Sequence, residues 1–133
     1  TTQDWHPPDT PHFTKDGGTW PVHCVRETTG AEFHPSLRDD PRITVISKGV
    51  DDKEGYSAFD GTDLATRLRR QNVDEVVVGG LATDYCVKHS VLDALRHGFK
   101  VKAIENAMRP VDLQPGDGER AIDEMRDAGA EIF

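Results

Sequence analysis

Cysteine is scarce in this 133-residue chain, which has only two, Cys24 and Cys86. Two cysteines do not make the disulfide framework that staples small exported domains, so we expect a cytoplasmic protein. Basic residues are in deficit as well: 24 acidic side chains outnumber 16 basic ones and leave a formal net charge of −8. Nucleic-acid binding needs a basic stripe, and we therefore expect no nucleic-acid partner.

Long apolar runs are also missing. No segment approaches the ~20 apolar residues that a membrane-spanning helix requires, so we expect no membrane partner. What is present suits a globular protein, because 35% of the residues are hydrophobic and 30% are charged. The chain has the usual length of one domain, and we expect residues 1–133 to form a single domain with a real core.

Strand and helix patterns alternate along the chain after a Pro- and Gly-rich loop over residues 1–40. Residues 106–111 are expected to form a connection with room for one helical turn. The alternation indicates βαβ units and predicts a three-layer α/β/α fold with a mostly parallel sheet. The predicted strands cover residues 42–47, 75–78, 99–104 and 131–133, and the predicted helices cover 62–70, 83–97 and 117–128.

Cys86 lies where the valine-rich strand turns into a helix. A helix N-terminus offers unpaired N–H groups and a positive dipole end, and both favour the nucleophilic thiolate. The alternative is a small packed core residue. Lys48 directly follows another predicted strand, and the carboxyl ends of parallel strands are where ligands bind. Its ammonium group could support a thiolate, although a plain surface charge is the competing interpretation.

Histidines and one aspartate in the first loop predict a metal site. Asp4 and His6 would lie on one face of an extended segment, and His12 and His23 follow in the same loop. Carboxylate and imidazole suit zinc, manganese or ferrous iron. The alternative is that these histidines are solvated or hydrogen-bonded to the backbone. Cys24 could be a further ligand, but a packed thiol is favoured.

Three groups of segments together resemble the nicotinamidase branch of the isochorismatase-like cysteine hydrolases. Their order and spacing fit, and the likeness extends over nearly the whole chain. The matching segments are Gln3–Pro7 with Trp20–Val25, Ser47–Gly49 with Tyr56–Gly61, and Gly80–Val87. The resemblance implies an isochorismatase-like fold and a homo-oligomer as a possible assembly.

The resemblance also implies an activity: hydrolysis of nicotinamide to nicotinate and ammonia through a cysteine thioester, in NAD salvage. Cys86 matches the nucleophile, Lys48 the lysine that supports it, and the N–H groups of Ala82 and Cys86 the oxyanion hole. The family has a cis peptide bond at the position of Leu81–Ala82. The metal ligands would be Asp4, His6 and His23, with His12 as the least certain, and zinc is expected before iron or manganese.

Aromatic residues complete the implied site. Trp20 matches a residue that stacks on the substrate ring, and Tyr56, Tyr85 and Leu81 fall at positions near the substrate. Core or rim packing is an equally good explanation of the tyrosines and the tryptophan. Another small-amide hydrolase of the same family remains an alternative activity.

One family element has no match. The catalytic aspartate lies near the end of the first strand in the family, and these 133 residues hold no such segment, since Asp4 is needed as a ligand. We expect that an N-terminal strand and helix precede Thr1 in the intact protein. If they do not, the general base is absent, and a non-catalytic metal-binding domain becomes the alternative.

Overall fold

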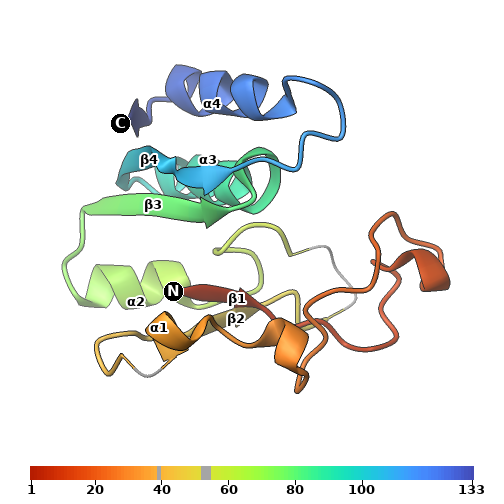
Figure 1. Cartoon of the computed structure of the whole chain (residues 1–133). Helices are drawn as coiled ribbons and strands as arrows, with labels where there is room; N and C mark the ends of the chain where they lie inside the picture. The colour runs from red at the N-terminus through yellow and green to blue at the C-terminus, as the bar shows by residue number, and fades with distance from the viewer. Residues whose placement is uncertain (39, 52–54) are drawn as a thin grey trace. The chain divides into compact units, whose positions relative to one another are not determined.

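The computed structural model describes residues 1–38, 40–51 and 55–133. The chain forms two compact units (Figure 1). Unit 1 comprises residues 1–55 and 60–62, and unit 2 comprises residues 56–59 and 63–133. Among the described residues, no helix has the length and apolar character needed to cross a membrane.

Unit 1 is mostly loop around a small parallel sheet. Strand β1 (Thr2–Asp4) runs parallel to β2 (Ile46–Lys48). The loop between them contains short helical turns at Thr14–Asp16 and Thr29–Ala31, and the one-turn helix α1 at Pro35–Arg38. Residues 1–40 are mostly loop as predicted, and their first residues, which resemble the exit of a strand in sequence, form β1. The predicted strand 42–47 is confirmed only over its last residues, and it extends to Lys48.

Unit 2 carries a three-stranded parallel sheet in the order β3-β4-β5. Its strands are β3 (Glu75–Leu81), β4 (Lys100–Arg109) and β5 (Glu131–Ile132). The parallel pairing predicted from the alternation is confirmed in both units. The connection expected over 106–111 was wrong, because β4 continues to Arg109. The polar residues in this part of β4 lack the apolar pattern of a strand. The register with β3 also shifts here, so that Gly80 lies opposite Met108.

The helices of unit 2 are α2 (Leu64–Arg70), α3 (Lys88–Arg96) and α4 (Asp117–Asp127). The helix predicted over 83–97 begins as a π-helical turn, Thr83–Val87, before α3. In this turn the N–H of Val87 donates to the carbonyl of Ala82 at 3.0 Å. Cys86 therefore lies in an irregular turn between β3 and α3, which places it at the carboxyl end of a strand as predicted.

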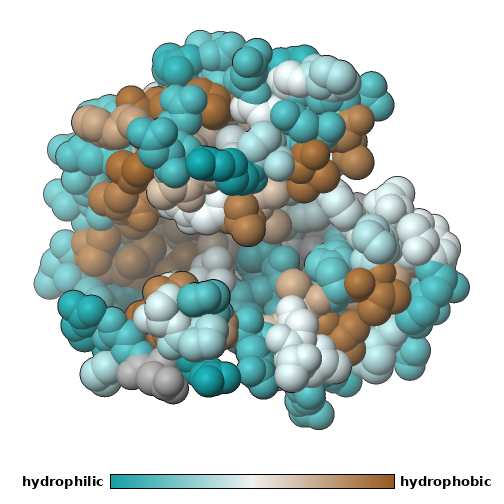
Figure 2. All heavy atoms as spheres, viewed as in Figure 1, coloured by the Kyte–Doolittle hydropathy of each residue, from teal (hydrophilic) through white to brown (hydrophobic). Residues whose placement is uncertain are grey.

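The core of unit 2 lies between its helices and its sheet. Burial of the apolar side chains in this core is the main contribution to the stability of the unit. The outer surface of α4, at the top of Figure 2, is hydrophilic, as its amphipathic sequence requires. The buried core residues are Val87, Val91, Ala94, Phe99, Val101, Ala103, Met108, Met125 and Ala130.

Candidate metal centre and active site

Three histidines of unit 1 converge on one point. One ring nitrogen from each of His6, His12 and His23 lies within 4.8 Å of the others. The ring centroids are 4.7 Å apart for His6 and His12, and 5.0 Å apart for His6 and His23. His6 is 2% exposed and His12 is 7% exposed. His23 is half-buried, and such a group of three imidazoles could hold a metal ion.

Backbone hydrogen bonds between distant loop segments produce this convergence. The N–H of His6 donates to the carbonyl of Cys24 at 3.0 Å, and the N–H of Arg26 donates back to His6 at 2.9 Å. This pairing brings His23 beside His6. His12 is held in the same way, because its carbonyl accepts the N–H of Trp20 at 3.2 Å.

Phe13 packs under the three imidazoles. It is fully buried, and its ring centroid lies 5.7 Å from that of His6, 5.9 Å from that of His12 and 5.5 Å from that of His23. An aromatic ring in edge or tilted contact with three imidazoles restricts their rotamers. The histidines are therefore held in place by packing as well as by the backbone.

The hydrogen bonds of two histidines fit metal binding. Nδ1 of His6 donates to the carbonyl of Gly49 at 3.0 Å, and Nδ1 of His23 donates to the carbonyl of Pro21 at 2.7 Å. Metal-ligating histidines commonly donate one ring N–H to a carbonyl and use the other nitrogen as the ligand. These two rings thus have the tautomer that leaves Nε2 for a cation. Imidazole donors fit zinc, and they fit iron or manganese less specifically.

Burial also keeps two of these rings neutral. The pKa of His12 is lowered to about 4, chiefly by desolvation and also by the neighbouring His6 and His23. Desolvation is likewise the largest cause of a lowered pKa at His6, where Asp4 acts in the opposite direction. Since a metal binds the neutral imidazole, these rings need lose no proton near pH 7.

Asp4 lies near the histidines but pairs with Lys48. The two residues are register partners at the ends of β1 and β2, and the Lys48 Nζ lies 2.5 Å from the Asp4 carboxylate. Lys48 is 4% exposed, and its ammonium also donates to the carbonyl of Gly55 at 2.9 Å. A buried ammonium needs such partners. The assignments of Asp4 as a metal ligand and of Lys48 as a catalytic residue stay predictions.

Gly49 allows His6 to approach the strand end. Its φ is +61°, and a Cβ built at this position would lie 2.5 Å from Cε1 of His6. Any side chain would therefore displace the ring. Sequence reasoning missed this role and that of Phe13, although a glycine directly after a strand that ends in lysine was a visible sign of a tight approach.

The predicted catalytic residues of unit 2 lie around the π-helical turn. Cys86 is half-buried, and the peptide bond between Leu81 and Ala82 is cis, as the resemblance implies. The Ala82 carbonyl accepts the N–H of Tyr85 at 3.1 Å. The roles of Cys86 as nucleophile and of the Ala82 and Cys86 amides as an oxyanion hole stay predictions.

The predicted substrate-binding residues fall in both units. In unit 1, the Trp20 ring stacks with that of His12 at 6.3 Å. In unit 2, the ring of Tyr56 lies 5.5 Å from that of Tyr85 and stacks with that of His89 at 5.4 Å. Leu81 is 72% exposed. Contact of these side chains with a substrate also stays a prediction.

Comparison with known proteins matches the whole chain, residues 1–133, to the isochorismatase domain. The nicotinamidase of Escherichia coli K12 is 39% identical over 99% of this chain and 72% of its own length. The zinc complex of Pyrococcus horikoshii pyrazinamidase is 46% identical, with a TM-score of 0.91 over 99% of this chain and 72% of that chain.

A third relative has been solved with a small molecule. The PnC1 protein of L. infantum, in complex with nicotinate, is 37% identical, with a TM-score of 0.90 over 99% of this chain and 69% of that chain. The family match and these identities agree with the resemblance found in the sequence. This chain is therefore a member of the isochorismatase family of α/β proteins, and it is similar throughout its length to nicotinamidases and pyrazinamidases.

Proposed function

We propose that this protein is a metal-dependent amidase that hydrolyses nicotinamide to nicotinate and ammonia. The observation that carries the proposal is the group of His6, His12 and His23, with donor atoms within 4.8 Å, in a chain 46% identical to a zinc-bound pyrazinamidase. The relative solved with nicotinate, the product of this reaction, supports the same substrate class.

The reaction is assigned to Cys86. Its thiolate attacks the amide carbon, a C–S bond forms, the C–N bond breaks, and the nitrogen leaves as ammonia after taking up a proton. Water then attacks the thioester, the C–S bond breaks, and nicotinate leaves with the thiol regenerated. The amides of Ala82 and Cys86 would receive the oxyanion in both steps.

Lys48 is proposed to stabilise negative charge in the reaction, because its ammonium is buried and already compensates a carboxylate. His6, His12 and His23 would hold zinc, with Asp4 as a further ligand or as a charge beside it. A bound divalent cation would supply a Lewis acid for the pyridine nitrogen of the substrate. Trp20, Tyr56, Tyr85 and Leu81 are proposed to bind the ring.

In this role, residues 1–133 would belong to one three-layer α/β/α domain that works in the cytoplasm, in NAD salvage. Self-association into a homo-oligomer is included as an expectation from the family. The resemblance assigns the general base to an aspartate for which residues 1–133 offer no match, and the chain spans 72% of the length of the Escherichia coli nicotinamidase. Turnover is therefore to be measured on the intact protein, with its mass determined in the same sample.

Ammonia release from nicotinamide and from a panel of aliphatic amides tests the substrate. Preference for nicotinamide is expected, and equal rates would instead favour a general small-amide hydrolase.

Cys86→Ala should abolish turnover and leave the zinc content unchanged, with Cys24→Ala as the matched control. His6→Ala should strip the metal and weaken nicotinamide binding. Retained turnover in Cys86→Ala would remove the nucleophile from the proposal.

A further inference from the structure

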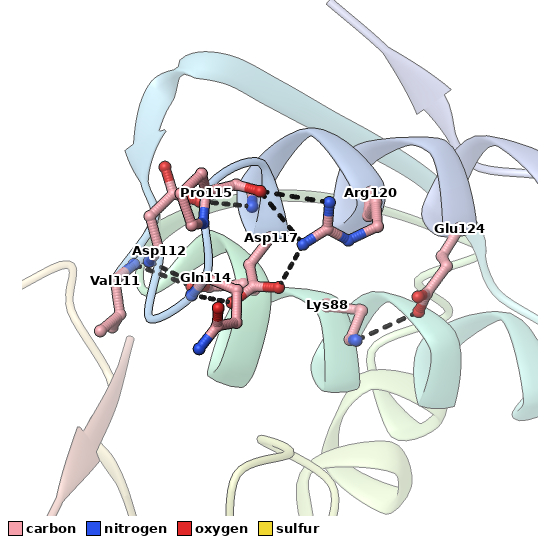
Figure 3. Close-up of polar contacts among 10 residues, drawn as sticks. Lys88, Val111, Asp112, Gln114, Pro115, Asp117, Arg120 and Glu124 are labelled. Atoms are coloured by element: carbon pink, nitrogen blue, oxygen red, sulfur yellow. Dashed lines mark hydrogen bonds and ion pairs between the residues drawn. The ribbon is translucent and has the colours of Figure 1, made fainter.

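A buried carboxylate lies two residues before Cys86 and ties its turn to a distant segment. Asp84 is 7% exposed. Its Oδ1 accepts the N–H of Val111 at 2.9 Å, and its Oδ2 accepts the N–H of Asp112 at 2.9 Å. Figure 3 shows these two amides side by side in the loop that follows β4. Both oxygens of the carboxylate are thus engaged by neighbouring backbone donors.

The contact continues to the start of α4. Asp112 has a φ of +54°, and its own Oδ1 accepts the N–H of Gly118 at 2.8 Å. Gly118 packs closely, because a Cβ there would lie 2.6 Å from Cβ of Pro110. Asp84 is therefore the first link of a chain of hydrogen bonds that runs from the π-helical turn to the first turn of α4.

The identity of this side chain calls for an explanation. A carboxylate two residues from a thiol that must ionise in the proposed reaction disfavours the thiolate, so electrostatics alone would select against an acid here. Two adjacent N–H donors, however, require two acceptor oxygens at one point. A carboxylate offers two, whereas an amide offers one and opposes the second N–H with its own donor.

We propose that Asp84 is a positioning residue that fixes the turn carrying Cys86 by anchoring it to the backbone of Val111 and Asp112. The inference rests on the proposed function, in which Cys86 is the nucleophile. Anchoring would fix the orientation of the Cys86 sulfur and of the amides at the start of the helix. The carboxylate charge itself would disfavour the thiolate.

The test is Asp84→Asn in the intact protein, with Asp123→Asn as the matched control. Asp123 has a side chain 69% exposed on α4, where it pairs with Arg126, so its substitution removes the same charge away from the turn. In Asp84→Asn, hydrogen exchange at the Val111 and Asp112 amides should rise by about tenfold, because a hydrogen bond to a charged group is lost. The control should leave that exchange unchanged.

The pH profile of alkylation by iodoacetamide measures the apparent pKa of the Cys86 thiol. A general loss of stability would not change this pKa, whereas loss of a positioning contact would. Loosening the turn should raise the apparent pKa of the Cys86 thiol, whereas loss of the charge alone would lower it. Cys24, which lies in unit 1, is the internal reference for each variant. A lowered Cys86 pKa, unchanged exchange, or equal acceleration of both thiols would overturn the proposal.

A second variant covers the case in which Asp84→Asn does not fold. Asp112→Gly keeps the positive φ and removes only the link to Gly118, so the same shift at Cys86 is expected with a smaller size. No shift in that variant would then overturn the proposal. Alkylation needs no substrate, so this outcome is independent of turnover. Retained turnover in Cys86→Ala would refute the proposed function and leave the thiol measurement to decide the role of Asp84.

Discussion

Replacing Gly49 with alanine should damage the metal centre through a single methyl group. The residue has a φ of +61°, a region in which a non-glycine residue costs about 1–2 kcal/mol. The new Cβ would lie 2.5 Å from Cε1 and 2.8 Å from Nδ1 of His6. Because the imidazole is buried, its displacement adds an overpacking cost of about 1–3 kcal/mol.

Gly61→Ala is the matched control for this experiment. Gly61 has a φ of +65°, and no heavy atom lies within 4 Å of a Cβ built on it. It should lose only the cost of the backbone conformation, about 1–2 kcal/mol. The difference between the two variants isolates the contact with His6, and it should amount to about 1–3 kcal/mol in the free energy of unfolding.

The assay combines denaturant unfolding in the presence of a chelator with a zinc titration of the folded protein. Gly49→Ala should bind zinc at least tenfold more weakly than Gly61→Ala. The displaced His6 ring would lose its hydrogen bond to the Gly49 carbonyl, and its Nε2 would no longer point toward the other two histidines. Equal unfolding free energies together with equal zinc affinities would refute the claim that Gly49 sets the position of His6.

Two further predictions concern charge in unit 1. In metal-free protein, the free energy of unfolding should fall as the pH drops from about 6.5 to about 4, because the unfolded state takes up protons there while His12, with its pKa of about 4, does not. Urea unfolding at successive pH values measures this, and a slope that survives unchanged in His12→Asn would contradict it. Lys48→Met should cost about 2–4 kcal/mol in urea unfolding, since it leaves the Asp4 carboxylate uncompensated. The double variant with Asp4→Asn should recover part of that loss, and an additive double variant would show that the ion pair does not couple the two residues.

Much of the fold could be predicted because its pattern is local. Valine runs and helical spacing predicted the parallel βαβ arrangement, and the strand-to-helix junction placed Cys86. The second half of β4 could not be predicted, because residues such as Glu105 and Asn106 have no strand pattern. They lie where the register with β3 shifts, between Ala103 and Met108, and the N–H of Glu105 donates to the carbonyl of Phe133 at 2.7 Å, a contact with the distant end of the chain. The π-helical form of the turn before α3 was equally invisible in the residue spacing.

The sequence by itself determined the chemistry that this chain can offer: imidazoles in one loop, a lysine at a strand end, a thiol at a helix start, and the motifs of its family. Only the tertiary structure decided which of these groups meet. His6 and His23 come together because the loop backbone pairs at Cys24, and Asp4 meets Lys48 because β1 and β2 align them in register. Asp84 holds Val111 and Asp112 across a long stretch of chain. Such contacts depend on hydrogen bonds and burial between segments that are remote in sequence, and residue spacing carries no record of them.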